Sequence, residues 1–343
     1  MSTLQNRIVR ARQLAGSRTD WKQISACCLF LCVGSPFFAR AQAGFTFRED
    51  PGRHVDVLLD DKPVVRYMIT HVPSSDPKSL TATNKPFLHL FDPQGKELIT
   101  NSGNGGEHPH HRGIMIGWTK TTFNGKLYNF WGMYNNAQIH RSFSVWETDR
   151  ERAVLTSQVD WITHAGETVI REARTITVRR ADAPAYAQVD VDSTLAACLG
   201  DVLLNGDPEH AGVQFRAADE TLRAATRFAY PGADTDPRKV SDPPWVAAQF
   251  TLAGKVYGVV QMNNTGNPRG SRISAYRNYC RFGYFPAPVT LKPGQPFTLR
   301  YRFLAFADGL PQTETLQRVC AAYTGCGDAS PAVTARPAEQ PAR

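Results

Sequence analysis

The sequence predicts an all-β protein, a large antiparallel β-sandwich with one short C-terminal helix. Apolar residues recur with a period of two along many segments, as in strands with one buried face. Turn signals rich in Gly, Pro, Asn and Asp separate these segments. A helical period is convincing in a single stretch only. The 343 residues are 42% apolar and 20% charged, which is a globular composition and excludes a disordered chain or a membrane bundle.

Three segments show the clearest strand pattern. Residues 187–195 (AQVDVDSTL) alternate small or apolar residues with polar ones, and 297–305 (FTLRYRFLA) are mostly apolar at odd positions. Ile170, Ile176 and Val178 share one parity in a run rich in Thr and Arg. We therefore expect half-buried strands in all three. Shorter strand candidates are 55–59, 63–69, 87–91, 143–147, 153–162, 246–252, 256–262 and 281–285. The turn signals between strands are Asp60-Asp61, Pro93-Gln94-Gly95, Asn124-Gly125, Ala253-Gly254-Lys255 and Lys292-Pro293-Gly294.

The C-terminal part contains the one predicted helix. An apolar stripe at i, i+3, i+4 and i+7 from Leu316 indicates a helix over 312–323, closed by Gly325. The tail 328–343 has no core-forming residues, so we predict that it is disordered. Residues 44–327 are expected to form a single sandwich domain, in which the Pro-rich stretch 231–244 is a long surface loop.

Residues 1–43 predict a secretory signal peptide. Six Lys and Arg residues against Asp20 alone make this segment basic, and they account for five of the chain's eight net positive charges. An apolar run, 24–38, follows, and 39–43 offers the small residues of a cleavage site. The alternative, an N-terminal membrane anchor, is disfavoured because the run is short and contains Pro36. We expect a periplasmic or secreted protein.

The remainder, 44–343, has a net charge of +3 and identifies no partner by charge. It contains no Lys/Arg run with interleaved aromatics, so we expect no nucleic-acid partner. It also contains no apolar run of membrane-spanning length. Four cysteines remain in this part, which allow two disulfides in three connectivities, or free thiols. They are Cys198, Cys280, Cys320 and Cys326.

The most distinctive polar pattern is a histidine-rich loop at 101–113 (NSGNGGEHPHHRG). Three histidines and an arginine fall within five positions, after a glycine-rich approach. The loop lies between the strand 87–91 and the apolar run 114–118, and so at the end of a sheet, where functional residues collect. If 110–112 is extended, His110 and Arg112 face one side and His111 the other, so the side chains need not converge.

Three interpretations of the histidine-rich loop compete. In the first it is a polar substrate pocket, where His108, His110 and His111 supply acid–base chemistry and Arg112 holds a carboxylate or hydroxyls. In the second it is a metal site, completed by a further histidine. In the third the histidines are structural. The spacing is not a usual zinc pattern, so no metal ligand is assigned. The histidines considered for completing a metal shell are His140, His164 and His210.

Aromatic and amide residues that follow the loop resemble the composition of a sugar site, because rings stack on sugar C–H faces and amides bond hydroxyls. Trp118, Asn124 and Trp131 are the ligand-binding candidates here, although most of the rings in 118–134 are expected to be core. Two further polar segments supply candidates. Glu209 and His210, close to Asp207, form an acid/base pair candidate, and Arg269 and Arg277 lie in an anion-friendly stretch.

These motifs carry a family resemblance. With His108-Pro-His-His-Arg-Gly followed by Phe123-Asn-Gly and Asn129-Phe-Trp131, the sequence resembles the bacterial family labelled "PmoA", or methane-oxygenase-like. The resemblance covers roughly 50–323, and at Arg277-Asn278-Tyr279-Cys280 the chain departs from the R-D-Y-G often seen in relatives. It implies a supersandwich similar to galactose mutarotase, in which, by analogy, a histidine acid and a carboxylate base act on a pyranose.

The leading functional hypothesis is an exported carbohydrate-active enzyme that binds a sugar or uronate-like ligand. His110 or His111 would be the acid/base, Arg112 would anchor the ligand and His108 would be the orienting residue. Glu209 or His210 would be the second-pole residue, a second acid/base group across the ligand. Isomerase, lyase and hydrolase remain open. The alternatives are a histidine-ligated, metal-dependent oxidoreductase and a non-catalytic periplasmic sugar-binding protein.

Overall fold

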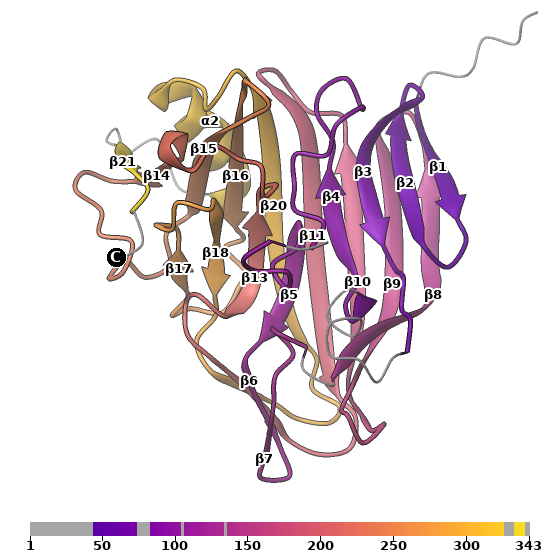
Figure 1. The fold of residues 1–343 in the computed structure, drawn as a ribbon. Coiled ribbons are helices and arrows are strands. Elements are labelled where there is room, and N and C mark those ends of the chain that lie inside the picture. Colours follow the sequence, from indigo (N-terminus) through magenta and orange to yellow (C-terminus); the bar gives the residue numbers. More distant parts are fainter. Residues whose placement is uncertain (1–43, 74–82, 104–105, 134–135, 326–332, 340–343) are drawn as a thin grey trace, which may run out of the picture. The chain divides into compact units, whose positions relative to one another are not determined.

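The alternating segments fold into three antiparallel sheets in the computed structural model, which describes residues 44–73, 83–103, 106–133, 136–325 and 333–339 (Figure 1). The strands of an eight-stranded sheet are, in spatial order, β1 (Phe45–Asp50), β2 (His54–Leu59), β3 (Lys62–Met68), β4 (Phe87–Leu90), β5 (Ile114–Trp118), β13 (Ala211–Arg216), β18 (Arg281–Phe285) and β17 (Arg272–Ser274).

The second large sheet has nine strands. In spatial order they are β21 (Val333–Pro337), β14 (Arg227–Pro231), β15 (Trp245–Leu252), β16 (Lys255–Asn263), β20 (Phe297–Ala307), β11 (Ala185–Ala197), β10 (Thr168–Arg179), β9 (Arg152–Ile162) and β8 (Ala137–Thr148). A small sheet contains β19 (Val289–Leu291), β12 (Val202–Asn205), β6 (Lys120–Phe123) and β7 (Lys126–Tyr128). A single 3-10 turn, η1 (Arg223–Ala225), precedes β14.

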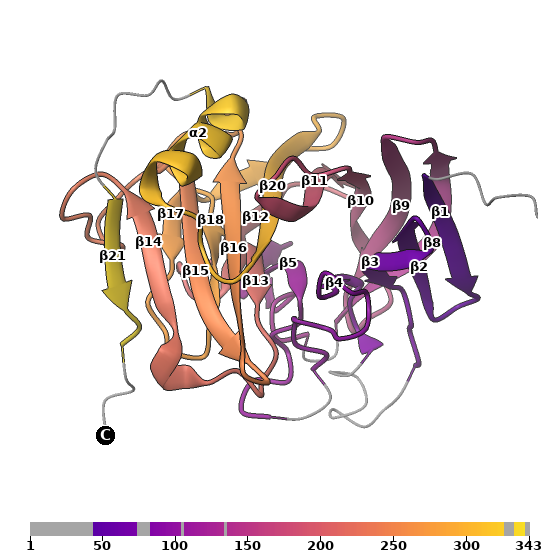
Figure 2. The ribbon, with the colours of Figure 1, turned by 90° about the horizontal axis from the view of Figure 1, so that it is seen from above.

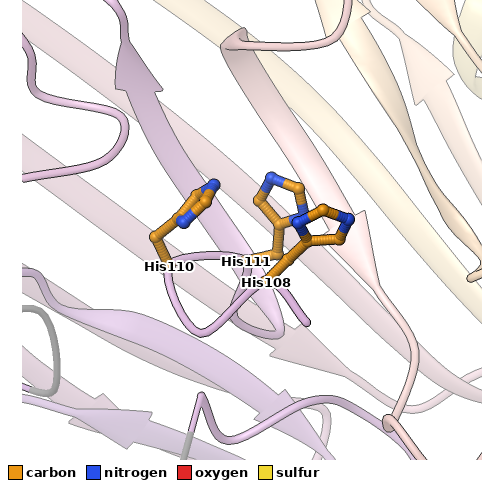
Figure 3. A group of neighbouring side chains, drawn as sticks. All are labelled: His108, His110 and His111. Carbon is orange, nitrogen blue, oxygen red and sulfur yellow. The ribbon is translucent and has the colours of Figure 1, made fainter. Parts of the chain in front are cut away.

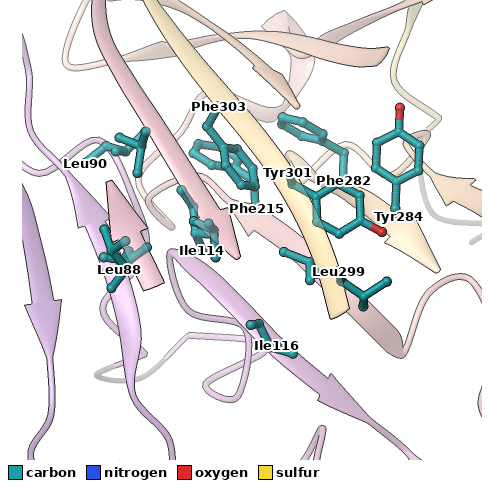
Figure 4. Packing of buried hydrophobic residues seen from close by; sticks show 14 of the residues in the cluster. Leu88, Leu90, Ile114, Ile116, Phe215, Phe282, Tyr284, Leu299, Tyr301 and Phe303 are labelled. Carbon is teal, nitrogen blue, oxygen red and sulfur yellow. The ribbon is translucent and has the colours of Figure 1, made fainter. Parts of the chain in front are cut away.

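The two large sheets face each other and bury one continuous apolar core (Figures 2 and 4). Leu88, Ile114 and Phe215 enter it from the eight-stranded sheet, and Leu299 and Phe303 from the nine-stranded sheet. The period-two pattern of each strand supplies these residues, because alternate side chains point to the same face. The predicted antiparallel β fold is therefore confirmed.

The predicted helix is confirmed as α2 (Thr313–Thr324). Its buried residues Leu316 and Cys320 pack on the nine-stranded sheet, against Trp245 and Val260. Neighbouring residues of the same strands point into the main core instead, so the helix covers the outer face. Gly325 ends the helix at φ 64°, in the left-handed region that glycine adopts without strain.

Two turn predictions are confirmed at residue level. Asn124 and Gly125 both have positive φ, at 47° and 72°, and join β6 to β7. Ala253 and Gly254 do the same between β15 and β16. Such two-residue turns match the twist of a hairpin. Asn124 is consequently an exposed turn residue, and its assignment to ligand binding stays a prediction.

The predicted disordered tail is partly wrong. Val333–Pro337 forms β21 and pairs with β14, at the edge of the nine-stranded sheet. An edge strand with unpaired backbone groups can capture a segment that carries little apolar surface, because the backbone supplies the hydrogen bonds. The signal-peptide prediction for 1–43 lies outside the described residues. No helix in the described part of the chain has the length and apolar character needed to cross a bilayer.

The two-disulfide interpretation of the cysteines is also wrong. Cys198 and Cys280 are free thiols, and every two-disulfide connectivity would need both of them. Cys280 is buried, and burial raises its thiol pKa to about 12, so it is not a reactive thiolate. Cys326 lies outside the described residues.

Candidate functional site

The histidine-rich loop is a tight turn, because the His111 amide donates to the His108 carbonyl at 2.9 Å. Asn101 closes it from behind, since its side-chain amide donates to the His111 carbonyl at 2.6 Å. The three imidazoles therefore project to the same side of the loop, and their ligating nitrogens lie within 4.8 Å of one another (Figure 3). The expected extended geometry is wrong, and the side chains converge.

Strand β13 joins this loop to the Tyr279 segment. The Arg216 amide donates to the Gly113 carbonyl at 2.7 Å, and the Ala217 amide donates to the Cys280 carbonyl at 3.1 Å. The Tyr279 ring consequently lies 4.8 Å from the His108 ring and is stacked on His111 at 5.9 Å. Arg281 donates to its hydroxyl at 3.3 Å. Tyr279 is half-buried and is the aromatic wall of the cluster.

Glu209 also reaches the cluster, but as one half of an ion pair. Its carboxylate accepts hydrogen bonds from Arg277 at 2.8 and 3.2 Å and from the Tyr276 hydroxyl at 2.7 Å, and it lies 3.7 Å from Arg281. Burial would raise the Glu209 pKa, but Arg277 and Tyr276 outweigh it and hold the pKa below its usual value. Both Glu209 carboxylate oxygens already accept hydrogen bonds, so Glu209 is ill suited to the predicted role of a base.

His210 lies at the exposed edge. Its Nδ1 is 2.9 Å from Asp207 Oδ1, and its ring is 6.3 Å from Trp131. Trp131 in turn contacts His111, with ring centroids 5.6 Å apart. The structure therefore brings the predicted second-pole residues to the histidine loop, through Trp131 on one side and Tyr279 on the other.

Arg112 lies beneath the rings with none of its side chain exposed to solvent. Its Nε donates to the Pro109 carbonyl at 3.2 Å, and its guanidinium lies over the Phe87 ring. Nη1 and Nη2 have no partner among the described residues. Lys85, which is 2% exposed, donates to the Trp131 carbonyl at 2.6 Å.

Burial and positive charge keep the histidines neutral. Burial, and then the charge of Lys85, lower the pKa of His110 to about 3. Burial and Arg281 hold the pKa of His111 well below its usual value, and burial also lowers that of His108. At neutral pH all three are therefore free bases.

Two basic side chains are buried beside these neutral rings. Burial lowers the Arg112 pKa to about 10, so Arg112 stays charged at neutral pH. Burial lowers the Lys85 pKa well below its usual value, and the charges of Arg112 and Arg174 lower it further. Neutral imidazoles next to cations can accept a proton, donate a hydrogen bond or ligate a metal.

The structure separates the remaining predicted residues from this cluster. Trp118 is buried in the main core against Trp161, 5.9 Å away, which argues against a ligand-binding role. Arg269 is exposed and lines a different pocket, together with Asn263 and other amide residues. His140 lies against Ser157. His164 is exposed next to Tyr128, so neither of these histidines completes a metal shell.

Three residues of the cluster have no role predicted from the sequence: Lys85, Tyr279 and Arg281. Lys85 has a signal that could have identified it, because a lysine in the sequence NKPF leads directly into the fully buried strand β4. Arg281 likewise begins the fully buried strand β18, where a charged side chain needs a partner. Tyr279 lies in the segment Arg277-Asn278-Tyr279-Cys280 of the family resemblance, but nothing in that pattern predicts that its ring lies against the histidine loop.

The family described as "Family of unknown function (DUF6807)" matches residues 54–321. No curated protein matches the sequence. Among solved structures, the chain is similar to galactose 1-epimerase from Lactobacillus acidophilus, with 10% identity, a TM-score of 0.36, and coverage of 78% of this chain and 99% of that one.

Two larger enzymes are similar over a part of their length. The values for a β-arabinopyranosidase are 11% identity, a TM-score of 0.37, and coverage of 72% of this chain and 39% of that one. A polysaccharide lyase has 11% identity and a TM-score of 0.31, with coverage of 77% of this chain and 33% of that one. The chain thus spans about a third of the length of these two proteins. Likenesses at these TM-scores assign no activity.

Proposed function

The chain belongs to the DUF6807 family, and on that premise we propose that it is a carbohydrate-active enzyme that begins its reaction by removing a proton from a sugar. His110 is the base, Arg112 anchors the ligand, and His108 and His111 hold the sugar in place. The resemblance to the family labelled "PmoA" and to galactose mutarotase agrees with a sugar ligand. Export to the periplasm or beyond the cell is part of the same proposal.

The observation that carries the proposal is the convergence of His110 with His108, His111 and Tyr279. His110 is partly exposed, lies 4.3 Å from the His111 ring, and is held neutral by burial and by Lys85. A pKa of about 3 leaves the His110 imidazole unprotonated but makes it a weak base, so it removes a sugar proton only where Arg112 and Arg281 stabilise the negative charge that forms on the sugar. The Tyr279 phenol, against His108, is positioned to return a proton.

The carboxylates favour isomerase or lyase chemistry over hydrolysis. Glycoside hydrolysis commonly uses two carboxyl groups that flank the scissile bond. At this cluster Glu209 is engaged by Arg277 and Tyr276, and Asp207 lies at the exposed edge next to His210. A histidine–tyrosine pair that moves protons on and off carbon or oxygen needs no second carboxylate.

A second candidate, a metal-dependent oxidoreductase, is favoured by one observation. His108, His110 and His111 offer three neutral ligands within 4.8 Å of one another, the number that an open catalytic site uses. Lys85, Arg112 and Arg281 oppose it, because their charges repel a divalent cation. A third candidate, a sugar-binding protein without turnover, predicts ligand-induced stabilisation and no product.

The test is a screen of the purified chain against neutral sugars, keto-sugars and uronates, with product detection and binding measured in parallel. We expect His110→Asn to lower kcat by about 10²–10⁴-fold, the usual contribution of a general base, and to leave binding nearly unchanged. Tyr279→Phe should lower kcat without loss of the stacking ring. His164→Asn, at an exposed position away from the cluster, is the matched control.

Turnover that His110→Asn leaves intact would contradict the proposal. Activity that disappears with a chelator and returns with a single added metal would support the oxidoreductase instead. Binding without any product across the screen would favour the sugar-binding protein.

A further inference from the structure

Beneath the partly exposed rings of His108 and His110 lies a group of four buried side chains, here called the donor cluster. It consists of Lys85, His111, Arg112 and Trp131, each at most 2% exposed. The atoms Arg112 Nη1 and Nη2, Trp131 Nε1 and both ring nitrogens of His111 have no hydrogen-bond partner among the described residues. Apart from one nitrogen of neutral His111, all of these atoms are donors.

The four side chains are contiguous. Lys85 Nζ lies 2.6 Å from the Trp131 carbonyl oxygen and 5.5 Å from the centroid of its ring. The Trp131 ring lies 5.6 Å from the His111 ring, and Arg112 follows His111 in the sequence. Lys85 and Arg112 lie close enough for the charge of Arg112 to lower the Lys85 pKa. Trp131 also belongs to one small cluster with Phe87 and Met115, and the Arg112 guanidinium lies over the Phe87 ring, so these side chains share one neighbourhood.

The surroundings of the donor cluster are apolar. Phe87, Met115 and Trp131 form a small buried cluster of their own, and the Arg112 guanidinium lies over the Phe87 ring. In such surroundings an unpaired charge is expensive to bury, and its interaction with a counter-charge is strong. A native fold retains such a charge where it has a use, because an apolar residue would be more stable there.

No carboxylate in the described chain pairs with Lys85 or Arg112. The nearby Glu172 is paired with Arg174, and Glu209 is paired with Arg277. Lys85 donates only to a backbone carbonyl, and Arg112 only through Nε to another. The arrangement is a set of preformed hydrogen-bond donors.

We propose that the donor cluster binds the acidic group of the ligand, a carboxylate or a phosphate ester carried by the sugar. The Arg112 Nη1 and Nη2 atoms form the fork that binds two oxygens, and the Lys85 amine and Trp131 Nε1 each donate a further hydrogen bond. That the ligand is a sugar rests on the proposed function. That the donor cluster binds an anion does not depend on it.

The test compares acidic with neutral ligands by calorimetry and melting temperature. The panel is glucuronate, galacturonate and glucose 6-phosphate, against glucose, galactose, acetate and inorganic phosphate. We expect the acidic sugars to bind at least about tenfold more tightly than their neutral counterparts, the factor that one charge-assisted pair contributes. A preference for uronates or for the sugar phosphate identifies which acidic group is the natural one.

Lys85→Met separates binding from folding. Methionine keeps the length and removes the buried amine, so we expect an unchanged or higher melting temperature together with the loss of the acidic preference. A lysine that only supported the fold would show the opposite: a lower melting temperature and an unchanged preference. Lys126→Met, at an exposed position in β7, is the matched control.

Equal affinity for acidic and neutral ligands in the native chain would overturn the inference without any variant, and would leave the proposed function standing. Binding of acetate and phosphate as tight as that of any sugar, lost in Lys85→Met, would support the donor cluster and contradict the sugar function.

Discussion

Gly103 is the residue on which the placement of Arg112 depends. Its φ is +73°, and a Cβ atom there would lie 2.5 Å from Arg112 Nε and from the Pro109 carbonyl oxygen. Only glycine combines this backbone conformation with so close an approach. The glycine-rich approach to the histidines thus has a physical use, since it lets the Arg112 side chain pass under the loop.

Replacement of Gly103 by alanine should displace Arg112. We expect Gly103→Ala to lower the affinity for acidic ligands by about tenfold or more, and to lower the free energy of unfolding by more than the roughly 1 kcal/mol that positive φ alone costs. Gly125→Ala is the matched control, because its φ is +72° and no atom lies within 4 Å of the added carbon. Calorimetry and urea denaturation measure both effects. Equal behaviour of the two variants would contradict the role given to Gly103.

At the scale of elements, one buried carboxylate links the strands under the site. Glu172 on β10 accepts from Trp161 on β9 and from Ser193 on β11, both at 2.8 Å, and from Arg174 at 2.7 and 2.8 Å. Arg174 then donates to the Pro86 carbonyl at 2.8 Å, next to Lys85. The nine-stranded sheet therefore helps to hold the segment that carries Lys85.

Breaking this pair should be costly. Glu172→Gln leaves Arg174 as a buried charge without its partner, so we expect the free energy of unfolding to fall by about 3–5 kcal/mol. The control is Asp160→Asn, which removes an ion pair with the half-exposed Arg141, and which should cost no more than about 1 kcal/mol. Urea denaturation measures both. A loss for Glu172→Gln as small as that of the control would show that Arg174 is stabilised by other means.

At the scale of the whole molecule, several buried histidines are neutral in the folded chain. Burial lowers the pKa of His89 to about 3 and holds that of His111 well below its usual value. In the unfolded chain the histidine pKa values are near 6.5, so between about pH 3 and pH 6.5 the unfolded chain binds more protons than the folded chain. The stabilisation that results is complete above about pH 6.5, and it is lost progressively as the pH falls toward 3.

The stability of the protein should therefore decrease on acidification below about pH 6.5. Each such histidine contributes a slope of about 1.4 kcal/mol per pH unit in that window. We expect His89→Gln to reduce the slope by the equivalent of one proton in denaturation series at pH 7.5, 6.5 and 5.5. Phe87→Leu perturbs the packing against the same ring without removing a titratable group, so it should lower stability at every pH and keep the slope. An unchanged slope in His89→Gln would refute this account.

The sequence by itself determined the elements. The period of two in 187–195 and 297–305 became the long strands β11 and β20, and the 3.6 period closed by Gly325 became α2. These features are local, because the alternation of side chains and the left-handed glycine depend on neighbours within a few residues. The histidine motif was also visible, as a pattern of residue types.

Only the tertiary structure decided how the site is composed. The turn at His108–His111 gathers the three rings, and pairing of β13 with β5 and β18 brings Tyr279 to them from far along the chain. Lys85, which has no motif of its own, enters from the segment before β4. Long-range strand pairing joins residues distant in sequence, and burial sets their charges. Both depend on the packed fold, and no local pattern records them.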